Sequence, residues 1–503
     1  MTKTSQGIRN SFFYNTLIVI SSGFIIKLLG LLNKIVITRL LGTAGMSLYI
    51  MSFPTILLFI NISSFSLNIT ISKLVAESLQ HHFLSPKRLI KEAIKLSIFM
   101  SIITILVLFL IIKPLTTNWL NNPDLFFPIL STIILIPLVG ISDTLKGYFN
   151  GLKKMTIPAT AGFIEQLTRI IFSILFIVIF KDYNIVFVTT LVLVTLSIGE
   201  LCSIIYLTIK LKKYKPLNII NTTGEKRSIL KVAVPNTFTR LIGSITYFFE
   251  PIIYTSVLLF IGFKKESIQT EYTIINAYAI PLLTTASFLS IGIATTLIPH
   301  IAENYVLKKM DSIAYYVHKT LVFAIVPGLL IAILLFLYPA EFMNLIYNTS
   351  KGVSYIRPFV FLFSLYYIQA PIVAILQAIG KSKLIFWCST IINLLRLVLI
   401  AGLSFIPKIG ITSIFYAITA TAIISTIIVF LFLVKYLKYK PDFSNILNII
   451  LLFLITFGIG ILIKRIIPIN FIFNSLIIAV LFASLTIYLK LLDIKSLHIN
   501  SKH

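Results

Sequence analysis

Apolar runs of roughly twenty residues, separated by short polar or charged segments, extend along the whole chain. A helix needs about 20 apolar residues to cross the roughly 30 Å of hydrocarbon in a bilayer, so this pattern predicts an all-α polytopic membrane protein. The runs give about 14 expected transmembrane helices, at residues 12–36, 46–71, 93–113, 125–149, 157–180, 185–209, 230–261, 273–299, 314–338, 357–379, 384–405, 411–434, 445–466 and 471–490.

The composition excludes a soluble globular domain and a nucleic-acid-binding protein. Of the 503 residues, 58% are hydrophobic and only 12% are charged, against about a quarter charged in soluble domains. The net charge of +27 favours a polyanionic partner at first sight, but the cations lie between the apolar runs. We therefore expect the lipid bilayer, and no nucleic acid, as a partner.

The positions of the cations predict the orientation in the cell membrane. With both termini in the cytoplasm, 28 of the 43 Lys and Arg residues fall in cytoplasmic segments and ten in outside segments. Cytoplasmic loops of membrane proteins carry such an excess of cations. We expect a multi-pass protein of the cell membrane with both termini cytoplasmic.

Three short motifs recur in the same order about 213 to 229 residues apart, which indicates an internal duplication. The first motif, Lys27–Gly30, recurs as Arg240–Gly243. The second, Pro54 with Ala76–Glu77, recurs as Pro281 with Ala302–Glu303. The third, Gly151 with Lys154 and Arg169, recurs as Gly380 with Lys383 and Arg396. They predict two pseudo-symmetric six-helix lobes, at residues 1–215 and 216–440. Residues 441–503 then hold two additional transmembrane helices and a cytoplasmic tail.

Basic residues inside the expected spans are candidate substrate contacts, because a charge in a span is costly and usually functional. Lys27 and Lys34 lie seven residues apart and share a helix face, with Asn33 beside Lys34, and Arg240 shares a face with Tyr247. If the duplicated spans face each other, these residues form a cationic cavity for a phosphate or pyrophosphate group. The alternatives are that Lys34 extends to the interface and that Arg240 pairs with Glu250.

Acidic residues in the spans form a second group of candidates. Glu165 and Arg169 have i, i+4 spacing, which favours a structural ion pair on one helix face, and Asp143 and Lys146, with i, i+3 spacing, are a second candidate pair of this kind. Glu200 and Glu250 have no evident partner on their own helices. We expect Glu250, Glu200 and Asp143 to be candidates for coupling to a proton or cation.

A polar run in the second expected span is open to two interpretations. Its side chains either line a hydrated cavity or bond to helix backbones. The run consists of Asn61, Ser63, Ser64, Ser66, Asn68, Thr70 and Ser72.

Motifs of common enzyme classes are absent from the sequence, which has no P-loop, no H-E-x-x-H and no G-x-S-x-G. We expect a protein that is not an enzyme and that needs no metal site and no cofactor. Coupling to H⁺, Na⁺ or the membrane potential stays open.

Three segments resemble the polysaccharide-transporter branch of the multidrug/oligosaccharidyl-lipid/polysaccharide flippase superfamily, which also holds the multidrug and toxin extrusion (MATE) antiporters. They are Ile26–Tyr49 (IKLLGLLNKIVITRLLGTAGMSLY), Ile71–Glu77 (ISKLVAE) and Gly147–Arg169 (GYFNGLKKMTIPATAGFIEQLTR). The likeness covers essentially the whole chain and is strongest to sporulation members of the branch.

The resemblance implies a flippase with two six-helix lobes that works by alternating access. Its implied cargo is an anionic polyprenyl-pyrophosphate-linked saccharide, a lipid II-like peptidoglycan precursor for the spore cortex, and cell-wall synthesis enzymes are candidate partners. The alternatives are a cation-coupled multidrug antiporter of the same fold, a membrane-embedded glycosyltransferase and a scaffold. The short loops disfavour the glycosyltransferase.

Overall fold

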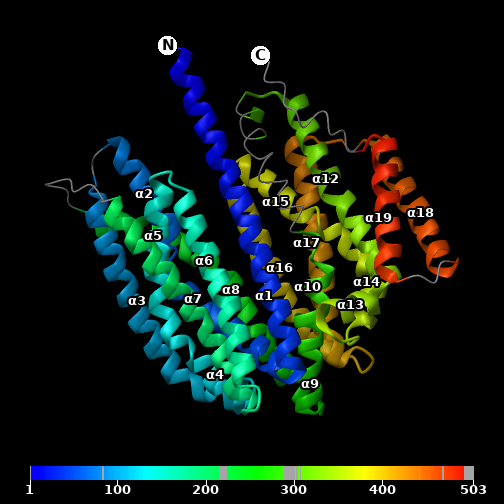
Figure 1. Ribbon diagram of the computed structural model, residues 1–503, viewed down its shortest axis with the longest axis horizontal. Helices are drawn as coiled ribbons and strands as arrows, with labels where there is room; N and C mark the ends of the chain where they lie inside the picture. Colours follow the sequence, from blue (N-terminus) through cyan, green and yellow to red (C-terminus); the bar gives the residue numbers. More distant parts are fainter. Residues whose placement is uncertain are drawn as a thin grey trace. The chain divides into compact units, whose positions relative to one another are not determined.

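The computed structural model describes residues 2–81, 84–214, 224–287, 301, 304–305, 307–440, 442–466 and 470–491, and within these ranges the chain is helical with no strand (Figure 1). Among the described residues, twelve helical segments are long and apolar enough to cross a membrane. The predicted all-α membrane class is therefore confirmed. The predicted Ala302–Glu303 repeat motif lies outside the described residues.

The first half of the chain contains α1 (Thr2–Ser64), α2 (Leu67–His81), α3 (Pro86–Pro114), η1 (Leu115–Trp119), η2 (Pro123–Leu125), α4 (Phe126–Leu130), α5 (Thr132–Gly151), α6 (Thr156–Ile179), α7 (Ile185–Lys213) and α8 (Glu225–Ile261). Next come α9 (Lys265–Thr273), η3 (Ile274–Ala279), α10 (Ile280–Leu283), α12 (Met310–Leu337), α13 (Pro339–Tyr347), α14 (Val353–Tyr366) and α15 (Gln369–Ala378). The remaining elements are α16 (Ser382–Ser404), η4 (Gly410–Thr412), α17 (Ser413–Leu437), α18 (Phe443–Ile466) and α19 (Phe471–Tyr488).

The twelve segments differ from the fourteen expected spans at two places in the chain. The first expected span and most of the second lie in α1, whose 63 residues measure about 95 Å at 1.5 Å per residue, too long for a single crossing. The second span continues into α2. Gly42 interrupts α1 between those spans with φ 65°, a backbone conformation that glycine adopts without steric cost. The expected span 273–299 begins in η3 and α10 and lies largely outside the described residues.

The chain divides into two compact units. Unit 1 comprises residues 1–273 and 397–413, and unit 2 comprises residues 274–396 and 414–503. Helix α8 packs with α1, α2 and α3 in unit 1. These units are defined by packing, whereas the expected lobes are defined by the internal repeat. The lobe boundary between residues 215 and 216 therefore stays a prediction.

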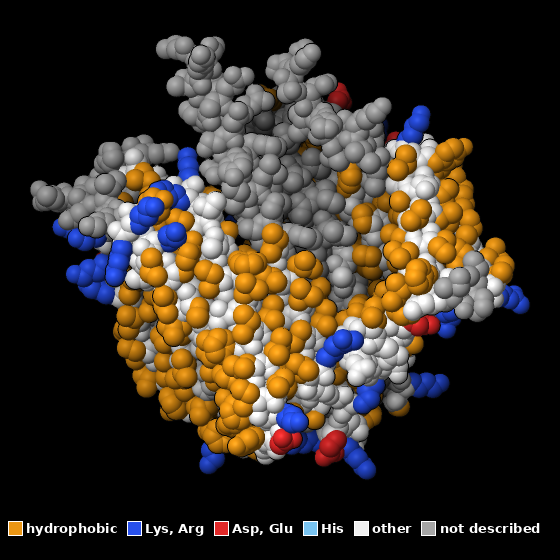
Figure 2. All heavy atoms as spheres, viewed as in Figure 1, with side chains coloured by type: hydrophobic (Ala, Val, Ile, Leu, Met, Phe, Trp, Pro, Cys, Tyr) orange, Lys and Arg blue, Asp and Glu red, His pale blue; other side chains and the backbone are white. Residues whose placement is uncertain are grey.

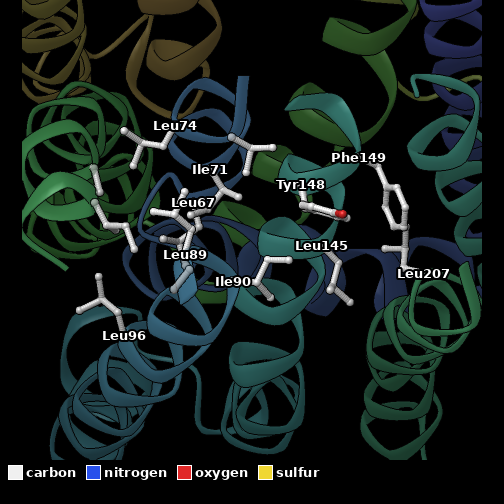
Figure 3. Packing of buried hydrophobic residues seen from close by; sticks show 14 of the residues in the cluster. Leu67, Ile71, Leu74, Leu89, Ile90, Leu96, Leu145, Tyr148, Phe149 and Leu207 are labelled. Atoms are coloured by element: carbon white, nitrogen blue, oxygen red, sulfur yellow. The ribbon is translucent and has the colours of Figure 1, made fainter. Parts of the chain in front are cut away.

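Aliphatic and aromatic side chains from α2, α3, α5 and α7 form a core in unit 1 (Figure 3). Tyr148 and Phe149 of α5 are buried aromatic members of this cluster. Helices α2 and α5 are in close contact because Gly147 has no side chain: a Cβ atom there would lie 2.6 Å from the backbone oxygen of Asn68. This contact fixes α5, which contributes two ionisable residues to the site described below.

The described part of unit 2 contains two clusters of buried apolar side chains. One joins α12, α15 and α17, and the other joins α12 to α18 and α19. In α16, Arg396 donates from Nε to Thr421 Oγ1 at 3.3 Å. Arg169 and Arg396, members of the predicted repeat, occupy similar places in the fold. Arg169 lies in α6, which follows a short turn after α5, and Arg396 lies in α16, which follows a short turn after α15.

The outer surface of unit 1 presents an apolar band to its surroundings (Figure 2). On α3 this band includes Phe99, Leu106 and Leu110, which are among the exposed large hydrophobic residues. Exposed apolar side chains over a whole helix length suit a lipid environment and not water.

Candidate functional site

A cavity of about 280 Å³ lies within unit 1, among membrane-spanning helices. One part of its wall is apolar and includes Phe53, Ile56, Leu57, Ile60, Leu135, Val139 and Leu196, together with Ser64. The other part carries six ionisable side chains: Asp143, Lys146, Glu165, Arg169, Glu200 and Arg240. Ionisable groups in a membrane-embedded cavity are the default candidates for a functional site.

Four of these side chains form a closed ion-pair network. Glu165 accepts from Lys146 Nζ at 2.8 Å through Oε2, and its Oε1 lies 2.7 Å from Arg169 Nη2. Glu200 accepts from Lys146 at 3.1 Å through Oε1 and from Arg169 at 3.3 Å through Oε2. Each carboxylate oxygen therefore faces one cation, and the network has no net charge.

Three helices supply the network, and local sequence explains its geometry. Glu165 and Arg169 are one turn apart on α6. Helix α7 approaches them closely because residue 199 is glycine: a Cβ atom there would lie 2.8 Å from Arg169 Cγ and 2.8 Å from the Glu165 backbone oxygen. This close approach places Glu200, the next residue on α7, beside both cations.

Burial makes the mutual compensation in this network necessary. The exposed fractions of the side chains are 16% for Lys146, 11% for Glu165, 17% for Arg169 and 6% for Glu200. An isolated charge at such a position loses hydration worth several kcal/mol, and opposite charges with good hydrogen-bond geometry offset the loss. Lys146 and Arg169 are thus neutralised by protein carboxylates.

Arg240 of α8 has a different environment. Its Nη2 donates to the side-chain oxygen of Asn61 on α1 at 2.8 Å. Among the residues that the structure describes, no ion pair within 4.0 Å involves Arg240. The alternative expectation of an Arg240–Glu250 pair is wrong, because the guanidinium is bound by an amide from another helix.

The cavity contains some of the predicted site residues and not others. Arg240, Glu200, Asp143, Glu165 and Arg169 line it. The remaining candidates, Lys27, Lys34, Asn33, Tyr247 and Glu250, are not among its lining residues.

The candidates outside the cavity lie on α1 and α8. Lys27 is exposed and Lys34 half-buried on α1, while Asn33 is buried. On α8, Tyr247 is half-buried and Glu250 is buried. Both affect Tyr272 of α9: burial, with Tyr247 and Glu250 nearby, raises the pKa of Tyr272 well above its usual value.

The structure gives Lys146 and Glu200 partners on other helices that spacing along one helix does not indicate, and it adds Asn61, which was not selected as a site residue. Lys146 pairs with Glu165 and Glu200, and no Asp143–Lys146 ion pair occurs in the described part of the chain. Glu200, which has no evident partner on its own helix, is in fact bound by cations of α5 and α6. Asn61 belongs to the polar run that was open to a cavity role, but its partner is 179 residues away.

Comparisons with known proteins agree on the class of molecule. The family described as polysaccharide biosynthesis protein matches residues 12–305, more than half of the chain. Stage V sporulation protein B of Bacillus subtilis (strain 168) is 30% identical over 84% of this chain and 83% of its own length. Lipid II flippase MurJ of the same organism is 23% identical over 73% of each chain.

Solved structures show the same fold. The inward closed conformation of the lipid II flippase MurJ has a TM-score of 0.70 at 16% identity and covers 94% of this chain and 99% of its own. An inward-facing MATE multidrug transporter has a TM-score of 0.58 at 14% identity, covering 84% and 98%. The activities named in these comparisons are those of flippases and transporters and not of enzymes.

Proposed function

The chain belongs to the polysaccharide biosynthesis protein family, and we propose that it is a flippase for a polyprenyl-pyrophosphate-linked saccharide. The family and the fold support a multi-pass membrane transporter of the flippase class. The choice of cargo is supported by the relatives named lipid II flippase and by the sporulation relative. We infer a peptidoglycan precursor for the spore cortex as the cargo.

The observation that carries this proposal is Arg240. It lines a membrane-embedded cavity and is bound by an amide, whereas the other two cations of the cavity are bound by carboxylates. A guanidinium presents a planar set of donors that matches the oxygens of a pyrophosphate. Lys27 and Lys34, on α1, are further proposed contacts for the headgroup.

Transport by alternating access follows from the chemistry of such a cargo. A pyrophosphate cannot cross hydrocarbon without replacing its hydration, while its polyprenyl chain remains stable in lipid. A potential that is negative inside favours outward movement of an anion by about 2.3 kcal/mol per charge per 100 mV. Glu250, Glu200 and Asp143 stay predictions for coupling to H⁺ or Na⁺.

The second candidate function, a cation-coupled multidrug antiporter, is favoured by the three carboxylates on the cavity wall. Glu165 and Glu200 are each bound by two cations, however, so they are already compensated. A cationic drug would have to displace Lys146 or Arg169 to bind there. The anionic cargo is therefore the better supported proposal.

Translocation of lipid II in reconstituted vesicles tests the proposal. We expect the intact protein to move lipid II, and Arg240→Ala to slow the movement by at least about tenfold, the loss of one hydrogen-bonded charge contact. Lys73→Ala, which changes an exposed residue of α2 with a 3.8 Å contact to Glu77, is the matched control and should transport normally. No movement by the intact protein under an imposed potential or ion gradient would overturn the proposed cargo.

A further inference from the structure

Asn61 is a buried amide that joins α1 to α8 beside the cavity. It is 7% exposed, and its Oδ1 accepts from Arg240 Nη2 at 2.8 Å. Its Nδ2 donates to Ser244 Oγ at 2.6 Å, and Ser244 Oγ donates to the Arg240 carbonyl oxygen at 3.1 Å. Because a guanidinium can only donate, the oxygen of the amide must face Arg240. The three bonds fix the Arg240 side chain relative to its own backbone.

The neutrality of Asn61 separates Arg240 from the other arginine of the cavity. Arg169 has Glu165 Oε1 at 2.7 Å and Glu200 Oε2 at 3.3 Å, so its charge is compensated. An aspartate at position 61 has the shape of asparagine and would place a carboxylate oxygen on Arg240. The amide therefore holds the guanidinium in place without neutralising it.

We propose that Asn61 is a positioning residue for the anionic headgroup, acting through Arg240. This inference rests on the proposed function, because it assigns the headgroup of that cargo to Arg240. Asn61 directs the guanidinium toward the cavity and leaves its positive charge for the pyrophosphate. Asp143, which also lines the cavity, interacts electrostatically with Arg240 but forms no ion pair with it within 4.0 Å in the described residues.

Asn61→Asp separates this role from a purely structural one. A structural role requires only a link between α1 and α8, and a carboxylate strengthens the bond to Arg240 by making it charge-assisted. A positioning role requires a neutral partner. We expect Asn61→Asp to keep or raise the melting temperature and to weaken binding of polyprenyl pyrophosphate by about tenfold to a hundredfold.

The experiment measures polyprenyl pyrophosphate binding to the full chain in nanodiscs, with thermal unfolding of each variant. Lys73→Ala, at an exposed position of α2 outside these bonds, is the control, and its affinity should stay within about twofold. Asn61→Ala adds no charge and removes the bond that orients Arg240. It should weaken binding severalfold, less than Asn61→Asp does, and it serves as the test if the aspartate variant does not fold.

The outcomes distinguish the two proposals. No binding by the intact protein would overturn the proposed function itself. Binding that is lost in Arg240→Ala but unchanged in both Asn61 variants would overturn only the role of Asn61. Weakened binding in a folded Asn61→Asp, with Lys73→Ala normal, would support it.

Discussion

Replacing Lys146 with methionine removes a cation that two buried glutamates share. Lys146 Nζ lies 2.8 Å from Glu165 and 3.1 Å from Glu200. Without it, two carboxylates face the single guanidinium of Arg169, and the neutral network acquires a net charge of −1. Methionine keeps the length of the aliphatic chain, so the change in packing is small.

The magnitude follows from the burial of the network. Its side chains are between 6% and 17% exposed, and removing one partner of a buried ion pair typically costs about 3–5 kcal/mol, because the other charge stays buried without compensation. We therefore expect Lys146→Met to lower the free energy of unfolding by about 3–5 kcal/mol.

A second substitution tests the stated cause. Lys146→Met with Glu200→Gln leaves only Arg169 and Glu165, a neutral pair at 2.7 Å. The double variant should therefore recover at least about 2 kcal/mol relative to Lys146→Met.

Unfolding by sodium dodecyl sulfate in mixed micelles gives the free energies for comparison. Lys73→Met is the matched control, because Lys73 forms an exposed 3.8 Å pair with Glu77, and it should change stability by less than about 0.5 kcal/mol. The reasoning fails if Lys146→Met loses less than about 1 kcal/mol, or if the double variant is less stable than the single one.

Two further predictions concern packing and pH. Gly147→Ala should destabilise the protein by about 1–3 kcal/mol in the same micelle assay, because the new Cβ atom would meet backbone atoms of Asn68. The control is Gly243→Ala in α8, where a Cβ atom would have no other atom within 4 Å, and it should be neutral or slightly stabilising. Burial raises the pKa of Tyr439 to about 12 from its usual value near 10. Between these values the unfolded chain releases the proton and the folded chain keeps it, so stability falls as pH rises from 10 to 12. Melting curves should show a shallower fall for Tyr439→Phe, and an identical slope would contradict this assignment.

Local sequence determined the class of the protein and most of its helices. Insertion of a helix depends on the hydrophobicity of about 20 consecutive residues, so α3, α6 and α7 could be predicted from their own composition. The approach of Glu165 to Arg169 follows in the same way from i, i+4 spacing, because one turn of helix brings these residues together. Gly42 lies between the first two expected spans, where the structure interrupts α1.

The partners of the charges were decided only by tertiary structure. Lys146 is 19 residues from Glu165 and 54 from Glu200, and Arg240 is 179 from Asn61. Spacing along one helix suggested Asp143 for Lys146 and Glu250 for Arg240, but neither forms an ion pair within 4.0 Å in the described residues. A buried charge takes whichever compensating group the packing of several helices brings within hydrogen-bonding distance. The sequence therefore determined which segments are apolar enough to cross the membrane, while the contacts between those segments decided which cations of the cavity are paired with carboxylates.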